Sequence, residues 1–119
     1  LYIQALELWR KLLGEEHPDV ATSLNNLANL YRSQGRYEEA EPLYIQALEL
    51  WRKLLGEEHP SVATSLNNLG ALYFSKEDYV RAEPLFVESL AIRDQKLGRQ
   101  HPWTVGTRQW LEATRSHLP

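Results

Sequence analysis

The sequence contains no cysteine and no methionine among its 119 residues. The missing cysteines exclude disulfides, thiol nucleophiles and cysteine metal sites. They also fit a reducing compartment, so we expect a cytoplasmic protein. No apolar run approaches the roughly 20 residues of a membrane helix, and no signal peptide is visible. The net charge of −3 lacks the basic excess of a nucleic-acid surface. We therefore expect neither a membrane nor a nucleic-acid partner.

What the sequence does contain is an internal repeat. Residues 2–43 and 44–85 align without a gap at a period of 42 and are identical at 33 of those positions. A third, more divergent copy begins at Phe86. Such a period is typical of solenoid proteins. An active site is usually a singular constellation, and no nucleophile–base pair, phosphate loop or metal spacing is present. We therefore expect a protein with no enzymatic activity and no cofactor.

Each repeat has the apolar spacing of two helices. In residues 18–33 and again in 37–55, apolar side chains recur with the period of one helix face. Gly35 and Gly56 are placed to end these helices, and Pro18 suits a first helical position. The pattern predicts an all-α protein of about six helices, at residues 1–13, 18–33, 37–55, 60–75, 79–97 and 102–117.

Stacked helix pairs of this kind form an α-solenoid, because neither helix of a pair can bury its apolar stripe alone. We expect a single array over residues 1–119. It would comprise the second helix of a truncated repeat (1–17), two full repeats (18–59 and 60–101) and a final first-type or capping helix (102–119). Since the chain opens inside a repeat and without methionine, we expect the natural protein to continue N-terminally.

The repeats resemble tetratricopeptide repeats. In the first full copy, the signature positions are Leu24, Leu27, Ala28, Tyr31, Gly35, Tyr37, Ala40, Tyr44 and Ala47. The strings LGEEHPDVATSLNNLANLY and GRYEEAEPLYIQALEL are similar to the long repeats of kinesin light chain and of related bacterial arrays. The resemblance implies that the first helices of successive repeats line a concave groove that accepts an extended peptide. It also implies that Asn26 and Asn68 contact the backbone of that peptide.

One face of the first helices is rich in amides, and we call it the predicted groove face. Its members are Thr22, Asn25, Asn26, Asn29, Arg32, Thr64, Asn67, Asn68, Phe74, Gln109 and Trp110. Asparagine is a poor helix former, so its use in mid-helix needs a reason. A side-chain amide can donate to and accept from a peptide backbone at once. Alternatively, the amides form a ladder between neighbouring repeats and only build the array.

Three histidines recur once per repeat, at His17, His59 and His101. Metal ligation needs donors within roughly 2.1 Å of one ion, and equivalent positions on stacked repeats should lie too far apart for that. Each histidine comes directly before a proline that opens a helix. We therefore expect these residues to cap helices or pack at corners, and we expect no metal site.

The two ends of the array depart from the pattern. The last copy places Arg108, Glu112 and Arg115 where the previous copy has apolar residues. This predicts a solvent-facing end cap and a poor contact surface. Alternatively, the helix is rotated so that a second set packs, namely Trp103, Trp110, Leu111 and Leu118.

The first helix bears apolar residues that lack a covering helix, at Tyr2, Leu6, Trp9 and Leu13. Exposed apolar patches usually find a partner, so residues 1–13 predict a weak homodimer. For the array as a whole, the leading hypothesis is a module that binds a peptide or protein segment of unknown identity. The alternative is a structural or self-assembling spacer within a larger protein.

Overall fold

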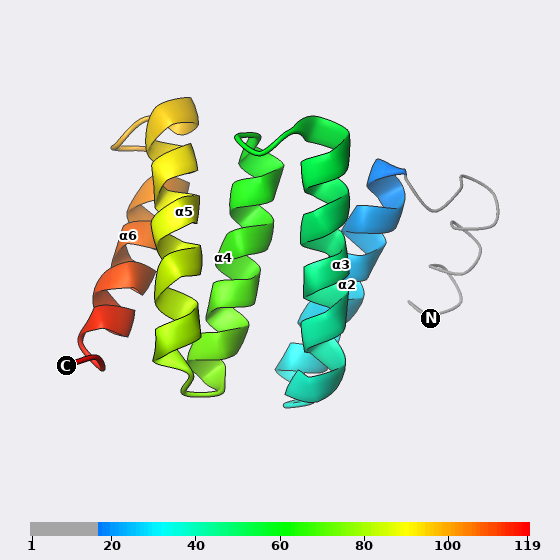
Figure 1. The fold of residues 1–119 in the computed structure, drawn as a ribbon, viewed down its shortest axis with the longest axis horizontal. Coiled ribbons are helices and arrows are strands. Elements are labelled where there is room, and N and C mark those ends of the chain that lie inside the picture. Colours follow the sequence, from blue (N-terminus) through cyan, green and yellow to red (C-terminus); the bar gives the residue numbers. More distant parts are fainter. Residues whose placement is uncertain (1–16) are drawn as a thin grey trace. The chain divides into compact units, whose positions relative to one another are not determined.

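The computed structural model describes residues 17–119, in which five helices follow one another (Figure 1). They are α2 (Pro18–Ser33), α3 (Tyr37–Leu55), α4 (Pro60–Ser75), α5 (Tyr79–Leu97) and α6 (Pro102–Arg115). The all-α prediction is confirmed, and α2 to α5 have the predicted bounds. The last helix ends at Arg115, slightly before the predicted end. The helix predicted at 1–13 lies outside the described residues.

The recurring histidines are helix caps. Nδ1 of His17, His59 and His101 accepts the backbone N–H two residues later, at 3.0, 3.0 and 3.1 Å respectively. Each bond satisfies one of the N–H groups that a helix start leaves without an intrahelical partner. The capping prediction is therefore confirmed. Between residues 17 and 119, no cluster of three or more potential metal-binding side chains occurs.

The turns inside the two helix pairs both need a left-handed residue. Gly35 has φ 75°, and Glu77 occupies the equivalent position in the next repeat with φ 60°. Glycine adopts this conformation without a Cβ clash, whereas glutamate is strained there. The turn geometry is thus kept even though its preferred residue has been replaced.

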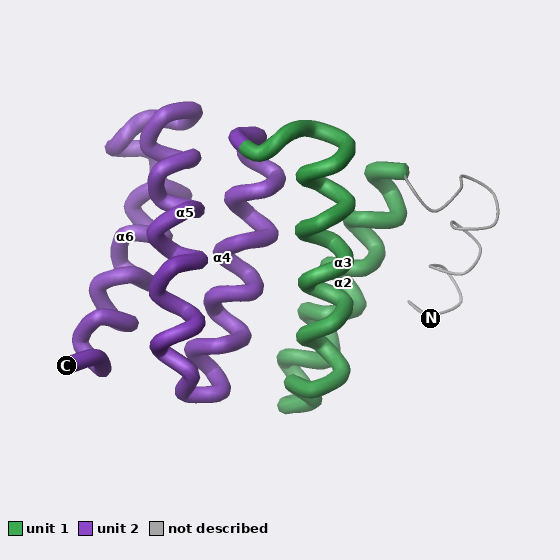
Figure 2. Tube along the Cα trace, in the orientation of Figure 1, with its two compact units in different colours: residues 1–57 green, residues 58–119 purple. Residues whose placement is uncertain are grey.

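The helices fall into two compact units, residues 1–57 and 58–119 (Figure 2). In the first unit, α2 packs against α3 around a buried cluster. The cluster comprises Val20, Leu24, Leu27 and Ala47, with Tyr31, Leu43 and Leu50 packed on it. In the second unit, α5 packs against both α4 and α6. Its fully buried side chains include Val62, Leu66, Leu72 and Phe86. The unit boundary lies beside the predicted boundary between the two full repeats.

The second unit has an unusually close contact between α4 and α5. A Cβ atom at Gly70 would stand 2.9 Å from the ring of Phe86, which has no exposed surface. The first unit has Ala28 and Tyr44 at the equivalent positions. At this helix crossing, one repeat therefore packs glycine against phenylalanine, and the other has alanine and tyrosine at the same positions.

A second difference between the repeats is an exchanged ion pair. Arg36 pairs with Glu39, and its guanidinium lies 4.3 Å from the ring centre of Tyr31. In the next repeat acid and base change places, as Asp78 and Arg81, at 3.4 Å. Arg81 then lies 5.7 Å from the ring centre of the equivalent tyrosine. Each repeat thus places an arginine over its own copy of this tyrosine. The sequence changes at the two charged positions therefore compensate each other.

Candidate functional site

The predicted groove face of α2 is partly open. Thr22 and Asn26 are exposed, whereas Asn25, Asn29 and Arg32 are half-buried. The hydroxyl of Thr22 donates to the carbonyl of Pro18 one turn earlier, at 3.1 Å. Asn26, which lies in the middle of the helix, is exposed to solvent.

Asn29 has a partner inside its own repeat. Its Oδ1 accepts the hydroxyl of Tyr44 at 2.5 Å, and burial raises the pKa of that phenol. In the next repeat both members change, to Ala71 and Phe86. A hydrogen-bonded pair is thus replaced by an apolar pair, which leaves no buried polar group unsatisfied. The sequence analysis missed this role, although the joint change of the two positions is visible in the repeat alignment.

On α4, the predicted groove face is half-buried and engaged with its neighbours. Oγ1 of Thr107 on α6 donates to Oδ1 of Asn67, at 3.1 Å. Oγ1 of Thr64 accepts from Arg93 on α5, at 3.2 Å. Asn68 and Phe74 are half-buried. At Asn67, the amide joins the first helices of two successive repeats, as the ladder alternative predicts.

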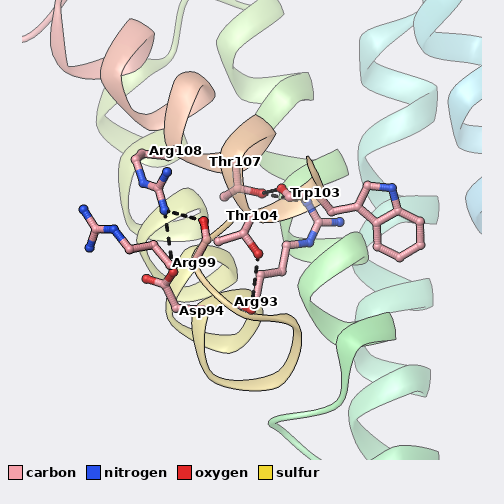
Figure 3. A network of polar contacts seen from close by, with 7 residues as sticks. All are labelled: Arg93, Asp94, Arg99, Trp103, Thr104, Thr107 and Arg108. Atoms are coloured by element: carbon pink, nitrogen blue, oxygen red, sulfur yellow. Dashed lines mark hydrogen bonds and ion pairs between the residues drawn. The ribbon is translucent and has the colours of Figure 1, made fainter. Parts of the chain in front are cut away.

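Arg93 is the centre of this network (Figure 3). Only 7% of its surface is exposed, and it donates through Nη1 to the carbonyl of Trp103 at 3.1 Å and to Oγ1 of Thr107 at 2.6 Å. All of its acceptors, Thr64 included, are uncharged. Burial lowers the pKa of the guanidinium. One buried cation thus links α4, α5 and α6.

The sequence analysis did not single out Arg93. The residue one repeat earlier is Trp51, so the change from tryptophan to arginine is visible when the repeats are aligned. The change is accompanied by hydroxyl groups on α6, where Thr104 replaces Val62 and donates to the Arg93 carbonyl at 3.3 Å. These changes were the available signal that the last repeat has a polar interior.

Helix α6 has three distinct faces. The buried face consists of Thr104, Thr107, Leu111 and Thr114. The second face is charged: Arg108 lies 3.7 Å from Asp94, Arg115 lies 2.8 Å from Glu83, and Glu112 is exposed. Of the residues that the predicted rotation would pack, Leu111 is buried and Trp110 rests on Phe86, but Trp103 is 58% exposed, so the prediction is wrong for Trp103. The charged residues instead form an outer surface tied to α5, in keeping with the end-cap alternative.

The third face of α6 contains a shallow hollow of about 320 Å³, lined by Gly106, Gln109, Trp110 and Ala113. Trp110 is 36% exposed. Its ring stacks on Phe86, with centroids 5.6 Å apart, and meets the ring of Phe74 edge-on at 5.2 Å. Gln109 is exposed. Two residues of the predicted groove face thus line one surface depression.

The family model for the tetratricopeptide repeat matches residues 1–44 and 19–95. The chain belongs to the tetratricopeptide repeat family. Tetratricopeptide repeats generally are non-catalytic modules that mediate protein–protein interaction or scaffolding. Among curated proteins, no sequence matches this one. In the described part of the chain, no helix is long and apolar enough to span a membrane.

Two solved structures are similar to this chain in fold. BtubC (BKLC) from P. vanneervenii has a TM-score of 0.90 and 36% identity, over 98% of this chain and 46% of that one. A putative kinesin light chain with nearly identical TPR-like repeats, from Podosopora anserina, also has a TM-score of 0.90, with 28% identity over 98% of this chain and 55% of that one. The resemblance to kinesin light chain repeats is confirmed. The chain spans about half the length of these structures.

Proposed function

We propose that this chain is a non-catalytic module that binds a peptide or protein segment through the predicted groove face, which α2 carries in the first unit and α4 and α6 carry in the second. The observation that carries the proposal is the hollow on α6. Its lining residues Gly106, Gln109 and Trp110 stand one repeat after Thr64, Asn67 and Asn68. The hollow thus lies in the register that the family resemblance assigns to ligand contact.

The chemistry available for binding differs between the two units. On α2, exposed Asn26 offers a free donor and acceptor for a peptide backbone. On α4, Thr64 and Asn67 already have partners on α5 and α6. The accessible groups of α6 are the amide of Gln109 and the ring of Trp110. We expect backbone hydrogen bonding at α2 and apolar contact at α6.

The second candidate function is a structural spacer. It is favoured by the bond between Asn67 and Thr107 and by the contacts of Arg93, which use polar groups to join helices. The two functions are compatible, because different side chains of the same face serve each one. The two functions predict different effects on peptide affinity and on stability when an exposed amide is replaced.

Replacing Asn26 with alanine tests the binding function. The probe is the most enriched peptide from a displayed random library, synthesised with a fluorophore. We expect its affinity to fall by about 1 kcal/mol, the value of one neutral hydrogen bond. Stability should stay the same or rise slightly, because alanine is the better helix former.

Asn67→Ala is the matched control, because it removes the bond to Thr107. We expect it to lower the free energy of unfolding by up to about 1 kcal/mol, because the better helix propensity of alanine offsets part of the lost hydrogen bond. Anisotropy titration measures the affinity, and urea denaturation measures the stability. If Asn26→Ala destabilises the chain and leaves peptide affinity unchanged, the amide is structural and the spacer function is the better account.

A further inference from the structure

Trp110, which lines the hollow on α6, contacts aromatic rings from two other helices. Its indole stacks on Phe86 of α5, with the centroids 5.6 Å apart and the ring planes 11° from parallel. It meets Phe74 of α4 edge-on, with the centroids 5.2 Å apart. Aromatic pairs in these geometries contribute more than the area they bury. Since Trp110 is 36% exposed, these neighbours fix the orientation of a ring that still has surface available to a partner.

Phe86 occupies this place because Gly70 has no side chain. A Cβ atom at Gly70 would stand 2.9 Å from two carbon atoms of the Phe86 ring, closer than a Cβ atom approaches its neighbours in folded proteins. The ring is fully buried, so packed atoms surround it on its other sides. A larger residue at position 70 would therefore displace the Phe86 ring, and Trp110, which stacks on that ring, would move with it.

The first unit has a different set of residues at the three equivalent positions. Where the second unit has Gly70, Ala71 and Phe86, the first unit has Ala28, Asn29 and Tyr44. In the first unit, the tyrosine hydroxyl donates to the asparagine side chain at 2.5 Å. The second unit lacks that hydroxyl, that amide and one Cβ atom. These three differences give the second unit an apolar interior on which a tryptophan ring can stack.

We propose that Gly70 and Phe86 are positioning residues of the hollow, which fix Trp110 in the orientation that receives an apolar side chain of the partner. The proposal deepens the proposed function and rests on it, since it takes the hollow as a binding site. Two lining residues, Gly106 and Ala113, have no polar side-chain atoms, and no lining residue is charged. A charged side chain of the partner would lose hydration there without meeting a counter-charge. This part of the groove therefore selects an apolar side chain.

A purely structural role for Phe86 leads to different expectations. The ring also belongs to the core of the second unit, so its loss lowers stability whether or not Trp110 moves. A test must therefore separate the position of Trp110 from the stability of the unit. Val62 provides the matched control, because it is fully buried on the same helix as Gly70, about two turns earlier. Val62→Ala destabilises the core without removing an aromatic ring.

Phe86→Leu and Val62→Ala are compared in the full chain. Leucine keeps position 86 apolar but has no ring for Trp110 to stack on. The position of Trp110 is followed by the NMR signal of its indole N–H, which the ring current of Phe86 shifts. We expect this signal to move in Phe86→Leu and to stay in place in Val62→Ala, with Trp103 of the same helix as the internal reference.

Binding is measured by anisotropy with the library-selected peptide. We expect Phe86→Leu to weaken its affinity about tenfold, and Val62→Ala to change it by less than about twofold. Alanine scanning of the peptide should identify one apolar residue that contacts the hollow. Replacing that residue with alanine should have little further effect in the Phe86→Leu chain, because two changes at one contact are not additive.

Gly70→Ala is an independent variant, because its Cβ atom would displace the Phe86 ring. We expect it to move the Trp110 signal and to weaken peptide binding, as Phe86→Leu does. It tests the proposal even if Phe86→Leu does not fold. Circular dichroism checks that each variant keeps its helices.

Phe86→Tyr combined with Ala71→Asn is the conservative variant. It keeps the ring and gives the new hydroxyl the kind of acceptor that Asn29 provides for Tyr44 in the first unit. We expect its peptide affinity to stay close to that of the unchanged chain. A requirement for the aromatic ring, and not for the exact residue, would then be established at this position.

Three results would overturn the proposal. They are a Trp110 signal that does not move in folded Phe86→Leu, a peptide affinity that is unchanged in this variant, and an equal loss of affinity in Phe86→Leu and Val62→Ala. The last would make Phe86 a core residue only. Failure of the proposed function is distinguishable, because peptide binding to the unchanged chain would then be absent or insensitive to Trp110→Ala. The Trp110 signal would still decide whether Phe86 positions the ring.

Discussion

Replacing Arg93 with alanine should lower the free energy of unfolding by about 2–4 kcal/mol, among the larger effects expected for a single substitution. The change removes three hydrogen bonds, to Thr64, Trp103 and Thr107, and the packing of a long buried side chain. Hydrogen bonds to charged groups are worth about 1.5–3 kcal/mol each. The net loss is smaller than their sum because the folded protein also bears the cost of burying the charge.

Urea denaturation of the Arg93→Ala chain measures this loss. Arg81→Ala is the matched control on the same helix, because the Arg81 side chain is 64% exposed and makes only a surface ion pair with Asp78 and a long contact with the Tyr73 ring. Exposed pairs contribute about 0–1 kcal/mol. If the two alanine variants are equally stable, Arg93 does not link the three helices as described.

Gly70→Val should cost about 2–3 kcal/mol, the upper part of the range for overpacked cores. The new Cβ would stand 2.9 Å from the Phe86 ring, which is fully buried and stacked on Trp110. Valine gains some helix propensity over glycine, about 0.3–0.5 kcal/mol. The steric term is larger, since ring and helix must move apart.

Gly106→Val is the control for this second substitution. It is also a helical glycine of the second unit, but no atom lies near its Cβ direction. We expect thermal denaturation to show no loss for Gly106→Val and a clear loss for Gly70→Val. Equal effects would mean that the contact with Phe86 has no energetic consequence.

The helices were predictable because their signals are local. Apolar periodicity, an opening proline and a terminal glycine depend only on residues a few positions apart. The second full repeat is the informative case, since α4 and α5 have the predicted bounds although Glu77 replaces the expected glycine at their turn. The packing of α4 against α5 therefore determines this turn, although Glu77 disfavours its left-handed conformation.

The roles of the polar residues were less predictable because they depend on distant partners. Asn29 and Asn67 look alike in sequence, yet one accepts from Tyr44 within its repeat and the other from Thr107 on the next. The residue type shows that an amide is present but not which group it meets. Comparison between repeats contains more information, because the Asn29–Tyr44 pair changes jointly to Ala71 and Phe86.

The same comparison shows how the last repeat departs from the earlier ones. Trp51 is replaced by Arg93, and the apolar stripe that would cover a following helix is replaced by Arg108, Glu112 and Arg115. Periodicity treats each helix alone, so it could not predict the ion pairs of Arg108 and Arg115 with α5. Their charge alone did predict an outer surface.

The most direct test of the binding account is a heteronuclear NMR titration of the chain with the library-selected peptide, at concentrations below self-association. The account predicts saturable shifts of the side-chain signals of Asn26, Gln109 and Trp110. The signals of Asn67 and Arg93, which are held by neighbouring helices, should change little. Shifts confined to the charged face at Arg108, Glu112 and Arg115, with Asn26 and Trp110 unaffected, would contradict it.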